Sequence, residues 1–408
     1  MTWSVYAVAT MDTKGQELAF LAERLRAAGV PVATVDVGTL AAPTVPADIA
    51  RATVIERHPE ASVRRALFHI TDRGQAITAM SQALENFLLE EYQSGRVAGV
   101  IGIGGSGGTA LVTLAMRALP IGLPKLMVST VASGNTAAYV GCSDITLMYS
   151  VVDVAGLNSV SRRILSNAAH AMAGMVKNSS QVEVQRPTLG LTMFGVTTPC
   201  VTAVRQALEA RGYDCLVFHA TGAGGQAMEK LVEAGLIGGV LDITTTEVAD
   251  HLVGGAFPCG ADRFAPILKA RVPYVLSTGA LDMVNFGAMA TVPEPFRNRK
   301  LHVHNAQVTL MRTTPEENRT FARWIASKLN RSVAPLVLLI PDRGVSALDA
   351  QGQPFFDPAA DEVLFDELEA AIDSTAWRQV RRLPYHINDP EFARAIVATY
   401  LDLAASPR

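Results

Sequence analysis

The sequence predicts an α/β protein made of two Rossmann-like domains, each with a largely parallel sheet flanked by helices, and a cleft between them. Its 408 residues are enough for two or three domains. Apolar runs typical of buried strands alternate with helical patterns along most of the chain, which is the signature of βαβ units. Similar strand, loop and helix patterns also recur in the same order in the two halves.

The repeat consists of three pairs of similar segments. A strand, a polar loop, a helix and a second strand over residues 4–38 are mirrored at 188–222. The other two pairs are a strand, glycine-rich loop and helix at 99–115 and 217–235, and a strand ending in Ser-Thr with its polar loop at 126–141 and 275–287.

These similarities predict one domain over residues 1–180 and another over 181–408, with residues of about 41–96 as additional material in the first. The boundary falls in the polar stretch 176–187, which ends in Pro. Chance similarity between generic βα units is the alternative, because all such domains share the same order of elements.

Composition and charge exclude several classes of protein. The net charge of -3 and the absence of a basic stripe disfavour nucleic-acid binding. The 4 cysteines form no CxxC pair, which argues against a disulfide scaffold or a cysteine zinc module and favours a reducing compartment. The hydrophobic fraction of 49% predicts a large buried core rather than disorder.

Neither a signal peptide nor a membrane span is expected. The N-terminus lacks a basic region followed by a long apolar run. Residues 97–116 carry no charge over about the length of a bilayer span, but the six glycines among them fit a strand, a loop and the start of a helix better. We therefore expect a cytoplasmic protein.

The glycine-rich loop of the first half is the main candidate for a phosphate site. It follows an apolar strand and enters a helix, so its backbone N–H groups point toward any anion at the positive helix end. It matches neither Walker A nor a clean GxGxxG pattern, and a tight turn alone would also select glycine. Its candidate cofactor-binding residues are Gly104, Gly105, Ser106, Gly107, Gly108 and Thr109.

Two further strand ends should meet this loop, because ligands of open parallel sheets bind outside the carboxyl ends of the strands. Lys14 would neutralise phosphate charge, and Asp36 ends a strand where an acid commonly accepts ribose hydroxyls. Helix capping by Asp12 or Thr13 and a solvated Lys14 are the alternatives. The candidates in these loops are Asp12, Thr13, Lys14, Ser133, Asn135 and Thr136.

The second half is richer in groups suited to bond chemistry, and several follow predicted strands. We expect acid–base chemistry from His219 or His304 with Glu247, and substrate carboxylate or phosphate binding by Arg263 or Arg312. Structural ion pairs are the alternative for the arginines. The candidate catalytic residues are His219, Glu247, His304 and Arg312, and the candidate substrate-binding residues are Thr245, Asp250, Arg263, Asp282, Asn285 and Asn305.

No resident metal site is predicted. His302 and His304 form an HxH pattern, but it lacks a third ligand at a suitable spacing and is more often structural. No GxSxG, HExxH or kinase motif is present, which argues against the common hydrolase classes.

Seven motifs in order along the chain resemble the Tm-one-like ATP-binding family, an uncharacterised family that includes the N-terminal part of a tomato tobamovirus-resistance protein. They are GIGGSGGT, STVASGNT, SVVDVAGLN, HATGAGGQAME, LDITTTEVAD, STGALDMVNFG and HNAQVTLMRTT. The resemblance implies two Rossmann-like halves, ATP bound in the first of them through residues 104–109, and a homodimer. It implies no settled reaction, and the antiviral role belongs to specialised plant relatives.

Three functions remain open on these grounds. The first is an ATP-binding enzyme acting on an organic or sugar acid in the cleft between the domains, where transferase or ligase chemistry would need Mg²⁺ to bridge the phosphates. The second is a nucleotide-independent hydrolase or lyase that performs acid–base chemistry on a phosphorylated or carboxylated small molecule. The third is a regulatory protein that ATP stabilises without being consumed.

Overall fold

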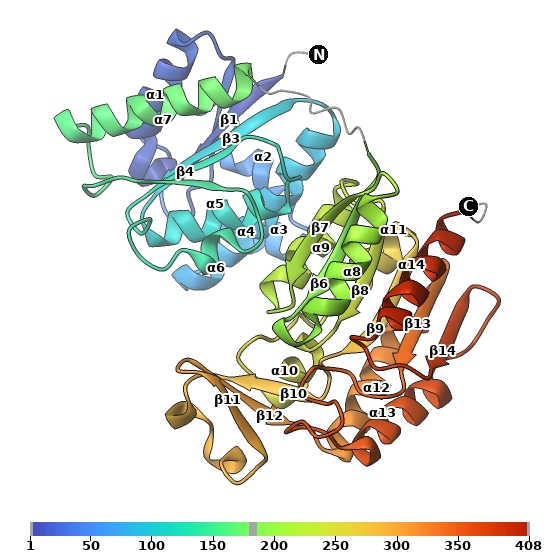
Figure 1. The fold of residues 1–408 in the computed structure, drawn as a ribbon. Helices are drawn as coiled ribbons and strands as arrows, with labels where there is room; N and C mark the ends of the chain where they lie inside the picture. The colour runs from blue at the N-terminus through green and yellow to red at the C-terminus, as the bar shows by residue number, and fades with distance from the viewer. Residues whose placement is uncertain (1–2, 179–185, 406–408) are drawn as a thin grey trace. The chain divides into compact units, whose positions relative to one another are not determined.

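The computed structural model describes residues 3–178 and 186–405 (Figure 1). The chain divides into two compact units, Met1–Val182 and Glu183–Arg408. The boundary expected between residues 180 and 181 lies outside the described residues. Each unit contains a parallel sheet flanked by helices, so the predicted α/β class with two Rossmann-like domains is confirmed.

The sheet of the first unit has five parallel strands in the order β2-β1-β3-β4-β5. Its central strands are almost wholly buried because helices cover both faces, which explains why they are apolar without alternation. The strands are β1 (Ser4–Ala9), β2 (Val32–Asp36), β3 (Val97–Gly104), β4 (Lys125–Ser129) and β5 (Thr146–Tyr149).

Two helical layers enclose this sheet. One core joins Leu18 and Leu21 of α1 and Met172 of α7 to one face, and the other joins Leu84 of α4 and Leu111 of α5 to the opposite face (Figure 1). The helices are α1 (Met11–Ala27), α2 (Arg51–Ile55), α3 (Ala61–Ala66), α4 (Arg73–Gln93), α5 (Ser106–Ala118), α6 (Ala137–Val140) and α7 (Ser159–Lys177).

The second unit has a six-stranded parallel sheet in the order β14-β13-β9-β8-β6-β7 and a three-stranded antiparallel sheet in the order β10-β12-β11. The strands of the parallel sheet are β6 (Thr188–Met193), β7 (Asp214–His219), β8 (Gly239–Thr244), β9 (Tyr274–Gly279), β13 (Leu336–Pro341) and β14 (Arg378–Leu383). Those of the small sheet are β10 (Met283–Phe286), β11 (Leu301–Asn305) and β12 (Val308–Arg312).

Helices again cover both faces of the large sheet. Val204 and Ile396 belong to the core on one face, and Val232, Phe321 and Leu364 to the core on the other. The helices are α8 (Thr198–Glu209), α9 (Ala223–Glu233), α10 (Glu247–Val253), α11 (Ala265–Ala270), α12 (Pro315–Leu329), α13 (Pro358–Ala371) and α14 (Pro390–Ala405). Thr314 forms a capping box with Glu317 at the start of α12.

The two sheets share the strand order 2-1-3-4-5, counted within each unit, and this tests the three predicted repeats. The first pair matches β1–α1–β2 with β6–α8–β7, and the third matches β4 with β9. The second pair is wrong, because it equates the third strand, β3, with an edge strand, β7, which is second. The true counterpart of the β3 loop is therefore the threonine-rich end of β8.

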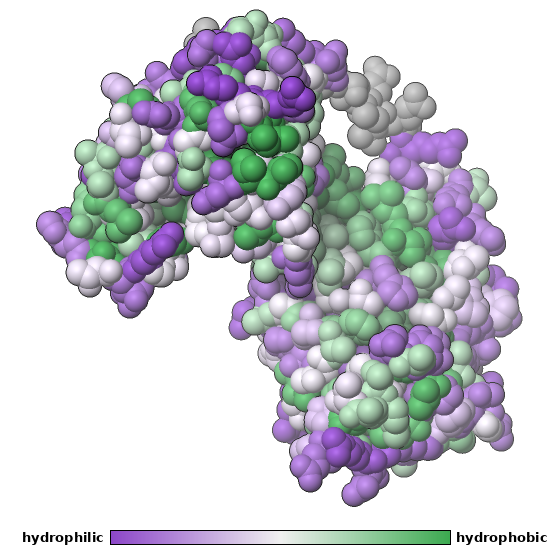
Figure 2. All heavy atoms as spheres, turned by 90° about the vertical axis from the view of Figure 1, so that its left-hand side faces the viewer, coloured by the Kyte–Doolittle hydropathy of each residue, from purple (hydrophilic) through white to green (hydrophobic). Residues whose placement is uncertain are grey.

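Residues 97–116, which imitate a membrane span in composition, form β3, the glycine loop and most of α5. No helix within residues 3–178 and 186–405 is both long and apolar enough to cross a membrane. Figure 2 shows hydrophobic patches in both units among hydrophilic residues. A mixed surface of this kind is ordinary for a folded protein and does not by itself mark an interface.

Candidate functional site

The glycine loop of the first unit leaves the amino end of α5 without a cap. The helix follows β3 directly, and no side chain bonds to the N–H groups of its first turn. Within the described residues the backbone N–H groups of Ser106, Gly107 and Gly108 have no hydrogen-bond acceptor, whereas that of Thr109 bonds to the Gly105 carbonyl. Three adjacent unpaired donors at a positive helix end can bind an anion.

The glycines of this loop are not all explained by backbone geometry. None of the four has a positive φ. A Cβ on Gly105 would approach only Thr130 Oγ1, at 3.7 Å, and one on Gly108 only the Ile103 carbonyl, at 3.8 Å. A side chain would therefore fit at both positions, so close packing does not require glycine at 105, the N-cap of α5, or at 108, in its first turn. Within the helix, at Gly108, glycine costs roughly 1 kcal/mol relative to alanine.

The second glycine loop, between β7 and α9, is different. Gly222 has a φ of 74°, and a Cβ there would lie 2.3 Å from the Pro258 carbonyl oxygen. A Cβ on Gly224 would lie 1.9 Å from the His219 carbonyl oxygen, and one on Gly225 2.1 Å from Glu247 Oε1. Close packing accounts for these glycines, so the tight turn alone explains why this loop is rich in glycine.

Arg73, which the sequence analysis missed, lies beside the glycine loop. Its Nη2 is 3.6 Å from the position of a Cβ on Gly107, and the side chain is exposed at the start of α4. It follows β2, some thirty residues upstream of the loop, in the segment treated as additional material. No sequence signal distinguishes Arg73 from other surface arginines. It lies beside the glycine loop only because α4 starts there in the folded structure.

The first turn of α1 lies at the same edge of the sheet, since it follows β1 and β1 pairs with β3. The polar loop expected here is helical, because α1 begins at Met11, with a kink at Lys14. Asp12 accepts N–H bonds from Leu40 and Ala41 and so fixes a neighbouring loop. Thr13 bonds back to Thr10. Lys14 is half-buried, and its ammonium makes no hydrogen bond or ion pair with any described residue, so of these three candidates it alone has a charge available for a ligand.

Asp36 does not serve as an open ribose acceptor in this structure. It is 1% exposed, and its Oδ1 accepts the N–H groups of Met11, at 3.1 Å, and Gly38, at 2.8 Å. Burial raises the pKa of this carboxyl, although the two N–H donors oppose the shift. Asp36 therefore fixes the start of α1.

The loop after β4 meets the glycine loop, because the Thr130 N–H bonds to the Gly104 carbonyl. Thr109 is fully buried and bonds to Ser129 at 2.6 Å, so its side chain joins the two strand ends instead of facing a ligand. Ser133 and Asn135 are exposed and Thr136 is half-buried.

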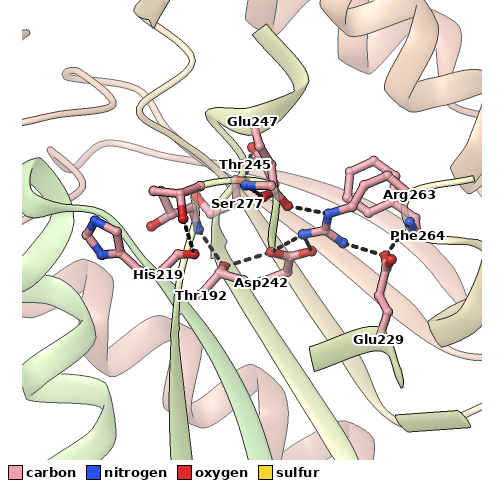
Figure 3. A network of polar contacts seen from close by, with 12 residues as sticks. Thr192, His219, Glu229, Asp242, Thr245, Glu247, Arg263, Phe264 and Ser277 are labelled. Atoms are coloured by element: carbon pink, nitrogen blue, oxygen red, sulfur yellow. Dashed lines mark hydrogen bonds and ion pairs between the residues drawn. The ribbon is translucent and has the colours of Figure 1, made fainter. Parts of the chain in front are cut away.

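In the second unit, Arg263 is the centre of a buried ionic network (Figure 3). Its guanidinium bonds to Glu229 at 2.8 Å, to Asp242 at 2.7 and 2.9 Å, and to Glu247 at 2.5 Å. Tyr274 donates to Asp242 at 2.8 Å. Arg263, Asp242 and Glu247 are at most 1% exposed, so the Arg263 guanidinium is enclosed by its carboxylate partners and out of reach of a substrate. The predicted substrate-binding role of Arg263 is corrected.

The network has three carboxyl groups and one guanidinium. Burial raises the pKa of Glu229 and of Glu247, which favours their protonated forms, while the charge of Arg263 opposes both shifts. Glu247 also accepts the Gly222 N–H at 2.8 Å. A fully buried, fully paired carboxyl cannot reach an external proton donor, so Glu247 is a structural residue rather than a general base.

The predicted catalytic set is not brought together. His219 is an exposed residue at the end of an edge strand, and its ring lies apart from Arg263 in Figure 3. His304 is exposed on β11, and Arg312 is buried against Asp361. Within the described residues no hydrogen bond or ion pair joins any two of His219, Glu247, His304 and Arg312. We expected these residues to meet because each follows a predicted strand. They do not meet, because His304 and Arg312 belong to the small antiparallel sheet.

The predicted substrate-binding residues are mostly interior. Thr245 donates to the Ser277 carbonyl, Asp250 accepts two bonds from Asn285, and Asp282 accepts the Ser346 hydroxyl. Apart from Arg263, described above, the sixth candidate is Asn305, which is exposed and closes a turn. The sequence predicts ligand contacts for these polar residues at strand ends. In the structure they form hydrogen bonds within the protein instead.

Burial raises the pKa of Cys200 to about 12 and that of Cys215 to about 11, so neither thiol is activated. No group of three or more His, Cys, Asp or Glu side chains within residues 3–178 and 186–405 is arranged to hold a metal ion.

The fold and the loop together define a protein of two Rossmann-like units with an uncapped glycine loop in the first. The model of the uncharacterised protein family UPF0261 matches it, with the N-terminal domain at residues 3–181 and the C-terminal domain at 186–404. The chain belongs to this family.

Its relatives span bacteria and plants. A UPF0261 protein of Rhizobium meliloti is 55% identical, over 98% of this chain and 99% of that protein. One of Clostridium tetani is 43% identical over 99% of each chain. The ToMV resistance protein Tm-1 of Solanum lycopersicum is 49% identical over 99% of this chain but 56% of its own. The family resemblance inferred from the seven motifs is thereby confirmed.

Proposed function

We propose that this protein binds ATP in its first unit, with the triphosphate at the amino end of α5, and acts as a cytoplasmic homodimer in small-molecule metabolism. The observation that carries the proposal is the set of three unpaired backbone N–H groups at residues 106–108 beside glycines with free space. Oriented amides at a helix start bind phosphate oxygens without any charged side chain.

Two cations support the same placement. The exposed Arg73 guanidinium lies beside Gly107, and the ammonium of Lys14 follows the neighbouring strand. A guanidinium binds two phosphate oxygens at once, whereas a lysine acts as a point charge. The exposed hydroxyls of Ser106 and Ser133 would add neutral hydrogen bonds.

Titration calorimetry with ATP, with and without Mg²⁺, tests the proposal. The wild type is expected to bind, and Gly105→Asp to lose binding, because its carboxylate would enter the phosphate position. The variant should fold, since a Cβ at this position meets nothing closer than 3.7 Å and φ is -80°.

Gly195→Asp is the matched control. It makes the same change of charge in the second unit, where a Cβ meets nothing within 4 Å. Equal ATP affinity in all three proteins, or no binding in any, would refute the phosphate site. Phosphate release from bound ATP then separates an ATP-consuming enzyme from a protein that ATP only stabilises.

A further inference from the structure

A cavity of about 330 Å³ lies in the second unit between α11 and the end of α12. Among the described residues its lining has four cationic side chains, three apolar ones and no acidic one, and we call it the basic pocket. Its cations are Lys269, Arg271, Lys328 and Arg331. A volume of this size is at the lower end of the usual range for small-molecule sites.

The positive charge of the basic pocket is not balanced within the protein. The exposed side chains of Lys269, Arg271 and Arg331 make no hydrogen bond or ion pair with any described residue. The whole chain has a net charge of -3, so this concentration of positive charge is local. Like charges confined to one cavity repel one another, and a bound anion would relieve that repulsion.

Arg271 has a backbone conformation that favours glycine. It ends α11 with a φ of 57° and a ψ of 31°, in the left-handed region. Helices commonly end in this conformation, but the residue is usually glycine because a side chain is strained there. No hydrogen bond or ion pair of the Arg271 side chain with a described residue offsets this cost. Strained residues of this kind cluster at ligand sites.

Both walls of the basic pocket are held in place. Arg378 is 6% exposed and donates to the carbonyl groups of Asn330, at 2.9 Å, and Ser332, at 3.1 Å, so it fixes the segment after α12. Lys328 donates to the Ala261 carbonyl, which joins α12 to the segment before α11. A site whose backbone is already ordered loses less conformational entropy when a ligand binds.

We propose that the basic pocket binds the phosphate group of a small molecule, with Arg271 and Arg331 paired to its oxygens. A guanidinium matches the geometry of phosphate and binds two of its oxygens at once. The rest of the molecule lies against Leu268 and Val333, of which the latter is 66% exposed. The pocket precedes β9 and β13, whereas substrates of open parallel sheets bind beyond the carboxyl ends of the strands. The ligand is therefore an effector of this unit, and its site does not depend on the ATP site proposed for the first unit.

Titration calorimetry with pyrophosphate tests this site in a protein that carries Gly105→Asp, so that the glycine loop of the first unit does not contribute. Pyrophosphate is expected to bind, and Arg271→Gln and Arg331→Gln are each expected to raise its Kd roughly tenfold. Arg343→Gln is the matched control and should leave the Kd unchanged. Arg343 is also exposed, and its guanidinium has no described partner, but it lies outside the basic pocket.

Citrate distinguishes phosphate recognition from general attraction of anions, because it carries a similar charge on carboxylates. It is expected to bind more weakly than pyrophosphate. Three results would overturn the proposal: no saturable pyrophosphate binding at millimolar concentration, an equal rise in Kd in Arg343→Gln, or citrate binding as tight as that of pyrophosphate.

Arg271→Gly tests the alternative that these cations only complement the negative ends of the helix dipoles. The variant removes one charge and also relieves the left-handed strain. If Arg271 is held for a ligand, the variant should bind pyrophosphate more weakly and yet have a higher Tm than its parent without anions, because glycine adopts a positive φ freely. A lower Tm with unchanged pyrophosphate binding would show that Arg271 serves only the end of α11.

Discussion

Arg73 shows how one side chain can decide affinity at the residue scale. It supplies a guanidinium beside the unpaired amides of the glycine loop. Replacing it with glutamine should raise the Kd for ATP roughly tenfold, since a charge-assisted hydrogen bond to phosphate contributes about 1.5–3 kcal/mol. Calorimetry of Arg73→Gln beside Arg65→Gln, an exposed arginine of α3, measures this. An equal rise in the Kd for ATP in the two variants would mean that the net charge of the unit, and not the position of Arg73, determines the affinity.

Asp349 makes a pH-dependent prediction at the same scale. Burial and the neighbouring charges of Asp282 and Asp361 raise its pKa to about 9 in the folded protein, whereas the unfolded carboxyl ionises near its ordinary 3.8. The folded state therefore binds the proton more tightly, and this contribution to stability is full below about pH 4 and is lost as the pH rises toward 9.

Asp349→Asn removes this loss because an amide cannot ionise. The variant should match the wild type in Tm near pH 4 and exceed it increasingly up to pH 8. Thermal unfolding followed by circular dichroism across that range provides the test, with the exposed Asp373→Asn as control. A constant difference at all pH values would show that Asp349 does not bind a proton in this way.

Single residues of the site could be predicted only where local sequence determines their role. The glycine loop is recognisable because it follows an apolar strand and precedes a helix. Arg73 is not, because its position depends on the path of α4. Thr109 and Asp36 have the expected residue types at the expected strand ends, but their partners, Ser129 and the Met11 and Gly38 amides, are known only from the fold.

At the scale of elements, Arg263 joins four of them. Its carboxylate partners come from α9, β8 and α10, and Tyr274 of β9 completes the network. Arg263→Met should destabilise the second unit by about 3–5 kcal/mol, because it leaves three buried carboxyl groups without their cation. Urea unfolding at pH 7 measures the loss. A variant as stable as the wild type would show that the carboxyl groups are neutral without Arg263.

Elements with strong local sequence signals were predictable. The correspondence between elements of the two units was harder to predict. The start of α12 follows from Thr314, Pro315 and Glu317, which form the observed cap. The match of the β3 loop with the β7 loop failed because glycine-rich turns recur wherever a strand meets a helix closely. Only the strand order shows that β7 is an edge strand. The small antiparallel sheet was not anticipated, since β10 and β12 are as buried as the parallel strands, although β11 is largely exposed.

At the scale of the whole molecule, each unit has its own hydrophobic cores. Two belong to the first unit and three to the second, and none shares residues with both. ATP should therefore raise the temperature of one unfolding transition more than that of the other, because a ligand stabilises the structure that binds it. Differential scanning calorimetry of the wild type and of Arg263→Met, whose lowered transition identifies the second unit, measures this. An equal shift of both transitions would contradict binding confined to the first unit.

Hydrogen exchange is the most direct test of the central claim, that phosphate binds to the amides at the start of α5. These amides have no acceptor in the described protein, so peptides covering residues 104–109 should exchange quickly without ligand. ATP should slow their exchange in the wild type and in Gly195→Asp, but not in Gly105→Asp. If ATP binds and leaves exchange in this segment unchanged, while protecting another part of the chain, the phosphate site has been placed wrongly.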